Sequence, residues 1–318
     1  MFSKKILVLK VDVDTYRGTR EGVPALLELF LEQGVNATFY FSLGPDQTGR
    51  ALKRIFRPGF FKKVSRTSVL KHYGIRTLLY GTLLPSPDIA VKCAKVMSKV
   101  FESGFEVGIH TYNHIKWQDY VSKKDYAWTK EQLQLAAEAF SKVFQRPAKT
   151  HAAAGWQINE HALQLEDSMQ FTYCSDTRGT TPFIPMIQGK KIRCPQFPTT
   201  LPTIDELIGK EVIDGNIDGN IDGNNVTDYL LNITKIESMF HNYTLHAELE
   251  GMRFLPVMRK LLQGWRQQGY QIVSLKEAYD ICINSEKTFA LPAHQIVMSE
   301  FPGRSGLLAL QGNAIKGP

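Results

Sequence analysis

The chain has 318 residues, of which 43% are hydrophobic and 22% are charged, and its formal net charge is +7. This composition excludes a disordered or fibrous chain and allows one large α/β domain with a full core. No segment reaches the roughly 18 uninterrupted apolar residues of a membrane span. The N-terminal apolar run is interrupted at Lys10 and Asp12, and no small-residue cleavage site follows it. We therefore expect neither a transmembrane helix nor a signal peptide.

The positive charge is concentrated in one segment. No acidic residue occurs between Asp46 and Asp88, whereas nine basic residues do. Without that segment the basic and acidic residues nearly balance, so we expect no general basic surface and no nucleic acid as partner. The basic residues of the segment are Arg50, Lys53, Arg54, Arg57, Lys62, Lys63, Arg66, Lys71 and Arg76.

Four cysteines are present, at positions 93, 174, 194 and 282. None belongs to a Cys-x-x-Cys pair, and each stands in or beside an apolar run. We interpret them as reduced, buried thiols of a protein from a reducing compartment.

Predicted strands and helices alternate along the chain. Apolar, β-branched runs predict strands at 6–11, 37–43, 105–109, 152–156, 171–175, 243–247 and 271–275. Helical periodicity, often with a start or stop residue, predicts helices at 22–33, 88–103, 126–144, 159–165, 226–239, 253–268 and 276–283. This alternation predicts parallel βα units in a barrel-like or doubly wound α/β domain, with functional residues at the carboxyl ends of the strands.

Two segments fall outside the alternation. Residues 213–225 repeat an Ile-Asp-Gly-Asn unit, and we expect an expanded surface loop there. Its aspartates recur every fourth residue and no glutamate closes the frame, which disfavours a calcium loop. Residues 286–318 are rich in proline and glycine and are predicted to form a loop-like C-terminal tail.

Side chains of metal-binding type follow two of the predicted strands. His110 and His114 come at the end of strand 105–109. If the chain turns helically there, both imidazoles lie on one face and reach one metal ion. Two ordinary polar histidines near a helix start would give the same pattern. Asp14, after the first strand, would complete a site of one oxygen and two nitrogen ligands with open positions for water and substrate.

Three further residues are candidates for acid–base chemistry. Asp12 precedes Asp14 by two residues, so both carboxylates can face one pocket, and Asp12 is the predicted base. His246 follows a late strand and is the predicted general acid. Asp176 is predicted to orient or tune a catalytic group. Each residue alone also fits a turn aspartate or a core histidine. Together, at strand ends, they favour metal-dependent amide hydrolysis through a tetrahedral intermediate.

These motifs resemble those of the NodB-homology polysaccharide deacetylases, whose fold is a distorted (β/α) barrel. Residues 11–14 are similar to the family motif with the base and metal-binding aspartates, and residues 110–114 to the motif with the metal-binding histidines. Residues 175–177 and 245–246 are similar to its fourth and fifth motifs. Residues 151–156 depart from the third motif, because they lack the arginine that steadies the base.

From about residue 5 to about residue 310 the chain also resembles bacterial deformylases within this family, through segments 11–24, 150–156 and 244–251. The resemblance implies removal of the formyl group from 4-deoxy-4-formamido-L-arabinose-phosphoundecaprenol. That step belongs to the aminoarabinose modification of lipid A, which lowers sensitivity to polymyxins and cationic peptides. It further implies a divalent metal (zinc, manganese or cobalt) and a peripheral position at the cytoplasmic face of the bacterial inner membrane.

We expect a catalytic domain over residues 1–285, with a basic insert at 47–87. The insert interleaves cations with aromatic and aliphatic residues, a combination that favours contact with an anionic inner-membrane surface. A basic lid packed on the barrel is the alternative. The predicted membrane contacts are Arg54, Phe60, Phe61, Lys62 and Lys63.

Three residues near the predicted site are candidate substrate contacts. Arg17 and Arg20 follow the metal-binding aspartate closely enough to hold a substrate phosphate. Trp156 belongs to the segment that resembles the deformylases. Two other functions stay open: N-deacetylation of another glycan, such as peptidoglycan, and a non-catalytic membrane-binding module. The sequence does not determine the oligomeric state.

Overall fold

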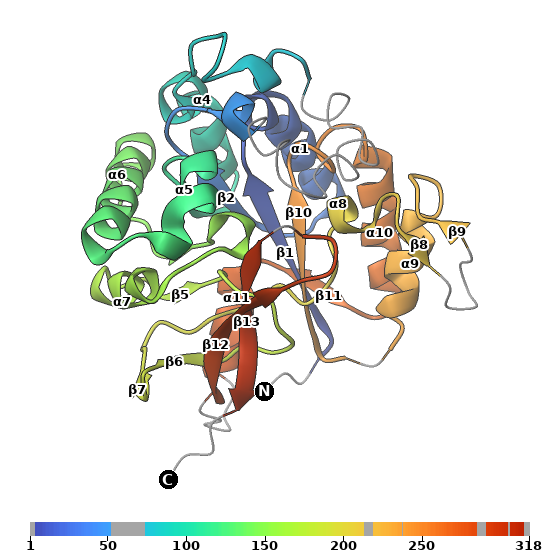
Figure 1. The fold of residues 1–318 in the computed structure, drawn as a ribbon. Coiled ribbons are helices and arrows are strands. Elements are labelled where there is room, and N and C mark those ends of the chain that lie inside the picture. The colour runs from blue at the N-terminus through green and yellow to red at the C-terminus, as the bar shows by residue number, and fades with distance from the viewer. Residues whose placement is uncertain are drawn as a thin grey trace.

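A computed structural model describes residues 4–51, 74–212, 219–236, 238–284, 291–304 and 306–314. At its centre is a parallel sheet of seven strands in the order β10-β1-β2-β3-β4-β5, with β11 beside the first half of β1. The sheet curls into a half-barrel with helices around it (Figure 1), which confirms the predicted fold class. Its strands are β1 Ile6–Val13, β2 Thr38–Ser42, β3 Glu106–Thr111, β4 Thr150–His151, β5 Tyr173–Cys174, β10 Phe240–His246 and β11 Gln271–Val273.

Strand β1 lies in the middle of the sheet, and all eight of its residues are buried. Neighbouring strands occupy both of its edges and side chains pack on both of its faces, which explains its nearly continuous apolar sequence. On one side the rings of Phe30, Phe39 and Phe105 contact one another, with centroids 5.7–6.2 Å apart. Burying each such ring contributes about 1.5–3 kcal/mol.

Local signals explain where the helices begin and end. Helix α1 has proline in its first turn and ends at Gly34, whose φ of 56° is the left-handed conformation that glycine adopts at low cost. Asp88 caps α4 and Asp125 caps α6: each side chain accepts a hydrogen bond from the backbone N–H three positions later in the chain. The helices are α1 Val23–Gln33, α4 Ile89–Glu102, α5 His114–Tyr120, α6 Tyr126–Phe144, α7 Glu160–Ser168, α8 Ile204–Leu207, α9 Val226–Ile233, α10 Leu255–Gln267 and α11 Leu275–Asn284, with short turns η1 Gly18–Gly22, η3 Thr77–Leu79, η4 Val121–Lys123 and η5 Ala154–Trp156.

The C-terminal tail is not loop-like, and that prediction was wrong. Residues 293–314 contain two antiparallel strands that join a second sheet in the order β13-β12-β6-β7. The backbone of Ala309 accepts a hydrogen bond from Arg178 N at 2.9 Å, which ties the hairpin to the catalytic half of the chain. β12 and β13 are consecutive in the chain, but β12 also pairs with the distant β6 (Ala293 with Ile184), and the proline and glycine content of the segment had led to the loop prediction. The strands are β6 Ile184–Ile187, β7 Lys190–Lys191, β12 Ala293–Glu300 and β13 Leu307–Ala314, with β8 Glu211–Val212 and β9 Gly219–Asn220 forming a separate pair.

Helix 226–239 was predicted too long, since α9 ends at Ile233. The chain turns at Thr234, whose hydroxyl donates to Gln268 Oε1 at 2.8 Å and accepts from Trp265 Nε1 at 3.2 Å. These contacts with α10 come from tertiary packing, which helical periodicity does not report.

Several predictions fall wholly or partly outside the described residues. The predicted membrane contacts Arg54, Phe60, Phe61, Lys62 and Lys63 all lie there, as does the first part of the 213–225 repeat.

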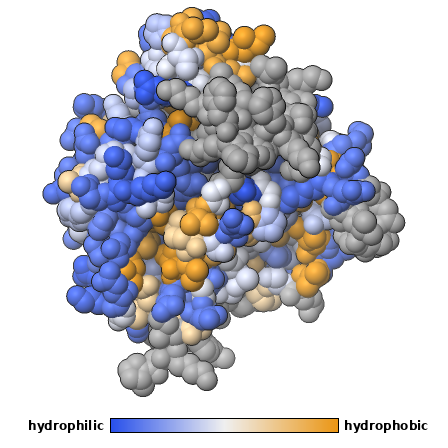
Figure 2. Space-filling model, in the orientation of Figure 1, coloured by the Kyte–Doolittle hydropathy of each residue, from blue (hydrophilic) through white to orange (hydrophobic). Residues whose placement is uncertain are grey.

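Among the helices that the structure does describe, none is long and apolar enough to span a bilayer. In the view of Figure 2 the surface is mostly hydrophilic, with apolar patches near the centre of the face. The four cysteines are buried, as expected, and the structure places none of them in a disulfide with another described residue.

Candidate active site

The carboxyl ends of three central strands bring the predicted site together. Asp12 lies near the end of β1 and Asp14 directly after it, while β3 carries His110. Strand β10 ends at His246, which lies opposite Asp12 in the parallel register. Residues far apart in sequence therefore meet at one edge of the sheet.

Asp14, His110 and His114 form a compact group. Asp14 Oδ1 lies 3.2 Å from His110 Nε2 and 3.4 Å from His114 Nε2. The two rings have centroids 5.3 Å apart. The predicted helical turn between the histidines was wrong, because His110 belongs to β3 and His114 is the first residue of α5. The chain bends at Tyr112, and Asn113 caps α5 by accepting a hydrogen bond from Lys116 N, which brings the second ring toward the first.

This group fits a divalent metal ion. Its three ligand atoms lie within 4.8 Å of one another. His110 Nδ1 donates a hydrogen bond to the carbonyl of Ala152 at 2.6 Å. Its unprotonated Nε2, which faces Asp14, is then the atom that can ligate a metal. Asp14 Oδ1 is buried and makes no hydrogen bond with the described residues. Burial by itself raises the pKa of Asp14. His114 and His110 lower it by more than burial raises it, so the pKa is well below its usual value.

Asp12 is paired with a lysine that the sequence analysis did not assign to the site. Lys10 Nζ lies 3.4 Å from Asp12 Oδ2 and donates to Ser175 O at 3.0 Å. Lys10 is completely buried. A cation thus stands beside the predicted base although the family's third-motif arginine is missing. The signal was available, since Lys10 is the single charged residue in the apolar run before Asp12. The other oxygen of Asp12 is buried without a hydrogen bond to the described residues.

His246 lies in a second group of charged residues. Its backbone N donates to Glu250 at 3.0 Å, and its Nδ1 lies 3.8 Å from Asp205 Oδ1. Burial lowers the pKa of His246, but the nearby carboxylates, Asp205 first among them, raise it above its usual value. Asp205 was not identified from sequence: it is the second residue of the four-residue helix α8, whose Thr203–Glu206 capping box marks a helix start and not a functional site.

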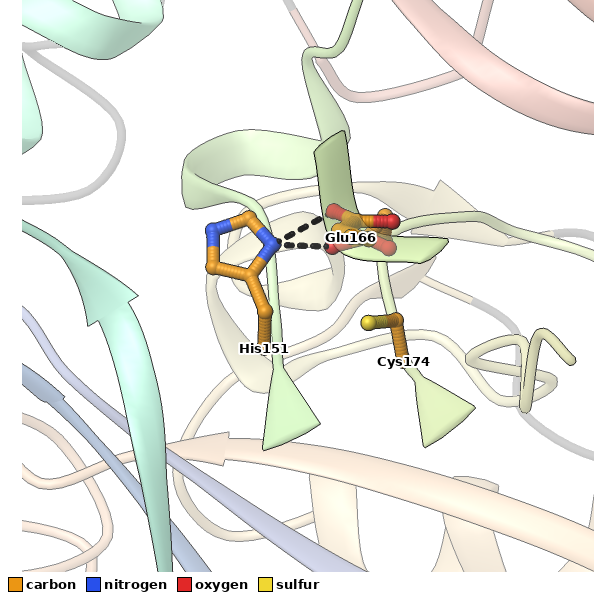
Figure 3. A group of neighbouring side chains, drawn as sticks. His151, Glu166 and Cys174 are labelled. Atoms are coloured by element: carbon orange, nitrogen blue, oxygen red, sulfur yellow. Dashed lines mark hydrogen bonds and ion pairs between the residues drawn. The ribbon is translucent and has the colours of Figure 1, made fainter. Parts of the chain in front are cut away.

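Asp176 contacts His151 and the backbone that follows it. Asp176 Oδ1 lies 2.9 Å from His151 Nδ1 and accepts from Ala153 N at 2.7 Å. Gln196 Nε2 donates to Oδ2 at 2.7 Å. Figure 3 shows His151 facing Glu166, 2.8 Å away, with Cys174 on the neighbouring strand. Because His151 Nδ1 lies within 2.9 Å of both carboxylates, we interpret the cluster as a buried ion network behind the site, in which His151 Nε2 and Glu166 Oε2 make no hydrogen bond with the described residues.

The charged residues of this cluster shift one another's pKa values. Burial lowers the pKa of His151, but Asp176 and Glu166 outweigh it and raise the value to about 9. Burial and the neighbouring Asp176 also raise the pKa of Glu166.

The three predicted substrate contacts are in different environments. Arg17 forms an ion pair with Glu21 at 2.9 Å, and the Arg20 guanidinium packs over the Tyr16 ring at 5.3 Å. The side chains of Arg17 and Arg20 are 30% and 52% exposed, so both remain accessible. Trp156 is buried and donates from Nε1 to Thr199 Oγ1 at 3.0 Å.

Glu248 belongs to segment 244–251, which resembles the deformylases, but the sequence analysis predicted no role for it. Its Oε1 accepts from Asp14 N at 3.1 Å, and from the backbone and hydroxyl of Thr15 at 2.8 and 2.7 Å. Glu248 therefore fixes the turn that carries Asp14 into the site.

The chain was compared with known protein families and curated proteins. The polysaccharide deacetylase family model matches residues 2–174. A protein of Shewanella sediminis is 34% identical over 307 residues, covering 96% of this chain and 95% of the relative. One of Wigglesworthia glossinidia brevipalpis is 31% identical over 300 residues, covering 94% and 100%. Both relatives are named probable 4-deoxy-4-formamido-L-arabinose-phosphoundecaprenol deformylase ArnD.

Solved structures support the same fold. A Mycobacterium smegmatis protein described as a polysaccharide deacetylase has a TM-score of 0.61 at 14% identity, covering 94% of this chain and 96% of that protein. The chain belongs to the polysaccharide deacetylase family. It is therefore a hydrolase of an amide carbon–nitrogen bond, in a family of metal-dependent enzymes, and it is similar to deformylases over most of its length.

Proposed function

We propose that this protein hydrolyses the formamide of 4-deoxy-4-formamido-L-arabinose-phosphoundecaprenol and thereby contributes to the aminoarabinose modification of lipid A. The observation that carries the proposal is the similarity to deformylases over nearly the whole of both chains. The grouping of Asp14, His110 and His114 with Asp12 and His246 supports it, because metal-assisted amide hydrolysis uses metal ligands, a base and an acid at one place.

In the proposed reaction Asp14, His110 and His114 hold a divalent zinc, manganese or cobalt ion. When bound, such an ion polarises the formyl carbonyl and activates water as a nucleophile. Asp12 accepts the proton of the attacking water, and Lys10 keeps its carboxylate in place from 3.4 Å. His246 donates a proton to the sugar nitrogen as the carbon–nitrogen bond breaks, which releases formate and the free amine. Asp176 supports the backbone of the 151–156 segment through Ala153 N.

We further propose that the protein attaches peripherally to the cytoplasmic face of the inner membrane through the 47–87 insert, where its lipid-linked substrate resides. The proposal rests on the residue pattern of the insert, since cations near an anionic leaflet contribute about 1 kcal/mol each. Sedimentation with vesicles containing or lacking anionic lipid tests it. Equal binding to both vesicle types, or no binding, would argue for a lid instead.

The decisive test of the reaction is mass spectrometry of a short-chain formamido-arabinose polyprenyl phosphate incubated with the purified protein. We expect loss of one CO unit, no loss after chelation, and recovery on adding zinc, manganese or cobalt. Asp14→Asn should bind less metal and lose the activity in parallel. Metal-loaded protein that leaves this lipid unchanged but deacetylates N-acetylated glycan oligomers would replace the proposal with the glycan alternative.

A further inference from the structure

The C-terminal hairpin delivers an arginine to the side of the site that holds His246. Arg304 lies in the loop between β12 and β13, and its side chain is only 12% exposed. We propose that Arg304 is a positioning residue for hydrolysis, which holds the carboxylate of Asp205 against Nδ1 of His246. The inference rests on the proposed role of His246 as the general acid.

Arg304 binds both carboxylate oxygens of Asp205 through the two terminal nitrogens of its guanidinium. Arg304 NH1 lies 2.9 Å from Asp205 Oδ2, and NH2 donates to Asp205 Oδ1 at 3.1 Å. A planar guanidinium that contacts both oxygens fixes the plane of the carboxylate as well as its position. The same NH2 donates to Thr203 Oγ1 at 2.8 Å, so the arginine also holds the start of α8.

This contact is part of a longer buried chain of charges. Arg304 Nε donates to Glu206 Oε1 at 2.6 Å, and Arg178 donates to Glu206 Oε2 at 3.1 Å. Glu206 in turn accepts from Thr203 N at 3.0 Å. Because Arg178 also pairs through its backbone with β13, the hairpin and α8 are fixed to each other at several points.

Trp156 lies under both arginines. The guanidinium carbons of Arg178 and Arg304 lie 4.7 and 4.6 Å from the centre of its ring. Trp156 has a φ of 54°, an uncommon value for a bulky residue, which must be held by its surroundings. Trp156, predicted as a substrate contact, thus packs against the guanidinium of Arg304 and helps to fix its position.

The consequence for His246 follows from its unused nitrogen. His246 Nδ1 is buried and makes no hydrogen bond with the described residues, and Asp205 Oδ1 faces it at 3.8 Å. A carboxylate at Nδ1 holds the proton on that nitrogen and stabilises the protonated ring, whose Nε2–H can then donate its proton to the substrate. If Arg304 is removed, Asp205 loses both guanidinium contacts and keeps the hydrogen bond from Thr203 Oγ1 to its Oδ1 at 2.5 Å, so its carboxylate, 26% exposed, is held less firmly beside His246.

The test compares Arg304→Ala, Arg304→Lys and the control Arg193→Ala, which removes a largely exposed arginine on another edge. For Arg304→Ala we expect kcat to fall about 10- to 100-fold, as for other residues that orient a functional imidazole, with little change in KM. Lysine should restore part of the rate, because it keeps one charged contact with Asp205. Unchanged kcat, or a rise in KM alone, would overturn the inference and make Arg304 dispensable or a substrate contact.

A double-mutant cycle shows whether Arg304 acts through Asp205. If it does, Arg304→Ala combined with Asp205→Asn loses no more rate than Asp205→Asn alone. Fully additive losses would overturn the inference.

A second readout does not depend on the substrate. The ring nitrogens of His246 are followed by ¹⁵N NMR in zinc-loaded protein and assigned with His246→Gln. Arg304→Ala should shift the His246 Nδ1 signal away from the position of a protonated ring nitrogen, because Asp205 no longer holds that proton, whereas Arg193→Ala should not. If wild-type protein leaves the formamido lipid intact, the proposed substrate is wrong, and these spectra still decide whether Arg304 positions His246. Unchanged spectra in Arg304→Ala would refute that role.

Discussion

Replacing Lys10 with methionine removes the cation beside Asp12 while keeping most of the side-chain volume. Lys10 is completely buried. Its Nζ lies 3.4 Å from Asp12 Oδ2, donates to Ser175 O at 3.0 Å, and lies 5.8 and 5.4 Å from the ring centres of Tyr40 and Trp156. Burial lowers the pKa of Lys10, while Asp12 and Asp176 act in the opposite direction and favour its charged form. Without the cation, Asp12 is a buried charge with no partner of opposite sign at that distance.

The expected magnitude follows from this geometry. Removing one member of a buried ion pair costs about 3–5 kcal/mol, because the remaining charge stays desolvated. In a chain of this size that corresponds to a fall in Tm on the order of 10 °C. Lys10→Met/Asp12→Asn removes both charges, and replacing a whole buried pair costs much less. The double variant should therefore be more stable than Lys10→Met alone.

The assay is urea denaturation of the wild type, both variants and Lys92→Met, which removes an exposed lysine of α4. The control should stay within about 0.5 kcal/mol of the wild type. If the double variant is as unstable as Lys10→Met, or less stable, the destabilisation comes from lost packing and the reasoning about the charge is refuted.

Two further predictions concern the substrate and pH. Arg20→Gln should raise KM for the lipid substrate several-fold while kcat changes little, because a phosphate contact is present before and during the reaction; Arg259→Gln is the surface control, and an unchanged KM would remove Arg20 from the substrate site. The pKa of His151 is raised in the folded protein to about 9 from its usual value near 6.5, so its stabilising contribution is complete below pH 6.5 and lost as the pH rises through about 9. Urea denaturation between pH 6.5 and 9 should show falling stability, and the fall should be shallower in Glu166→Gln, whose carboxyl, with its own raised pKa, no longer titrates; an equally steep fall in that variant would contradict this origin.

Much of the fold was predictable because the signals are local. The alternation of buried strands and amphipathic helices identified the parallel α/β sheet, and capping residues such as Asp88 and Gly34 marked helix ends. The predicted metal group also came from sequence, since Asp14 and His110 each stand at the end of a strand, and parallel strands bring such ends to one edge.

The sequence by itself therefore determined the fold class, the family resemblance and the residues of the candidate metal group, because short-range patterns and contiguous motifs encode them. Only the tertiary structure decided which charged residues stand behind them. Lys10 reaches Asp12 within one strand, but that both are buried depends on the surrounding sheet. Arg304 lies 58 positions beyond His246 in the chain and comes near it through the pairing of β13 with Arg178. Such pairings depend on packing between distant segments, which leaves no periodic trace in the sequence.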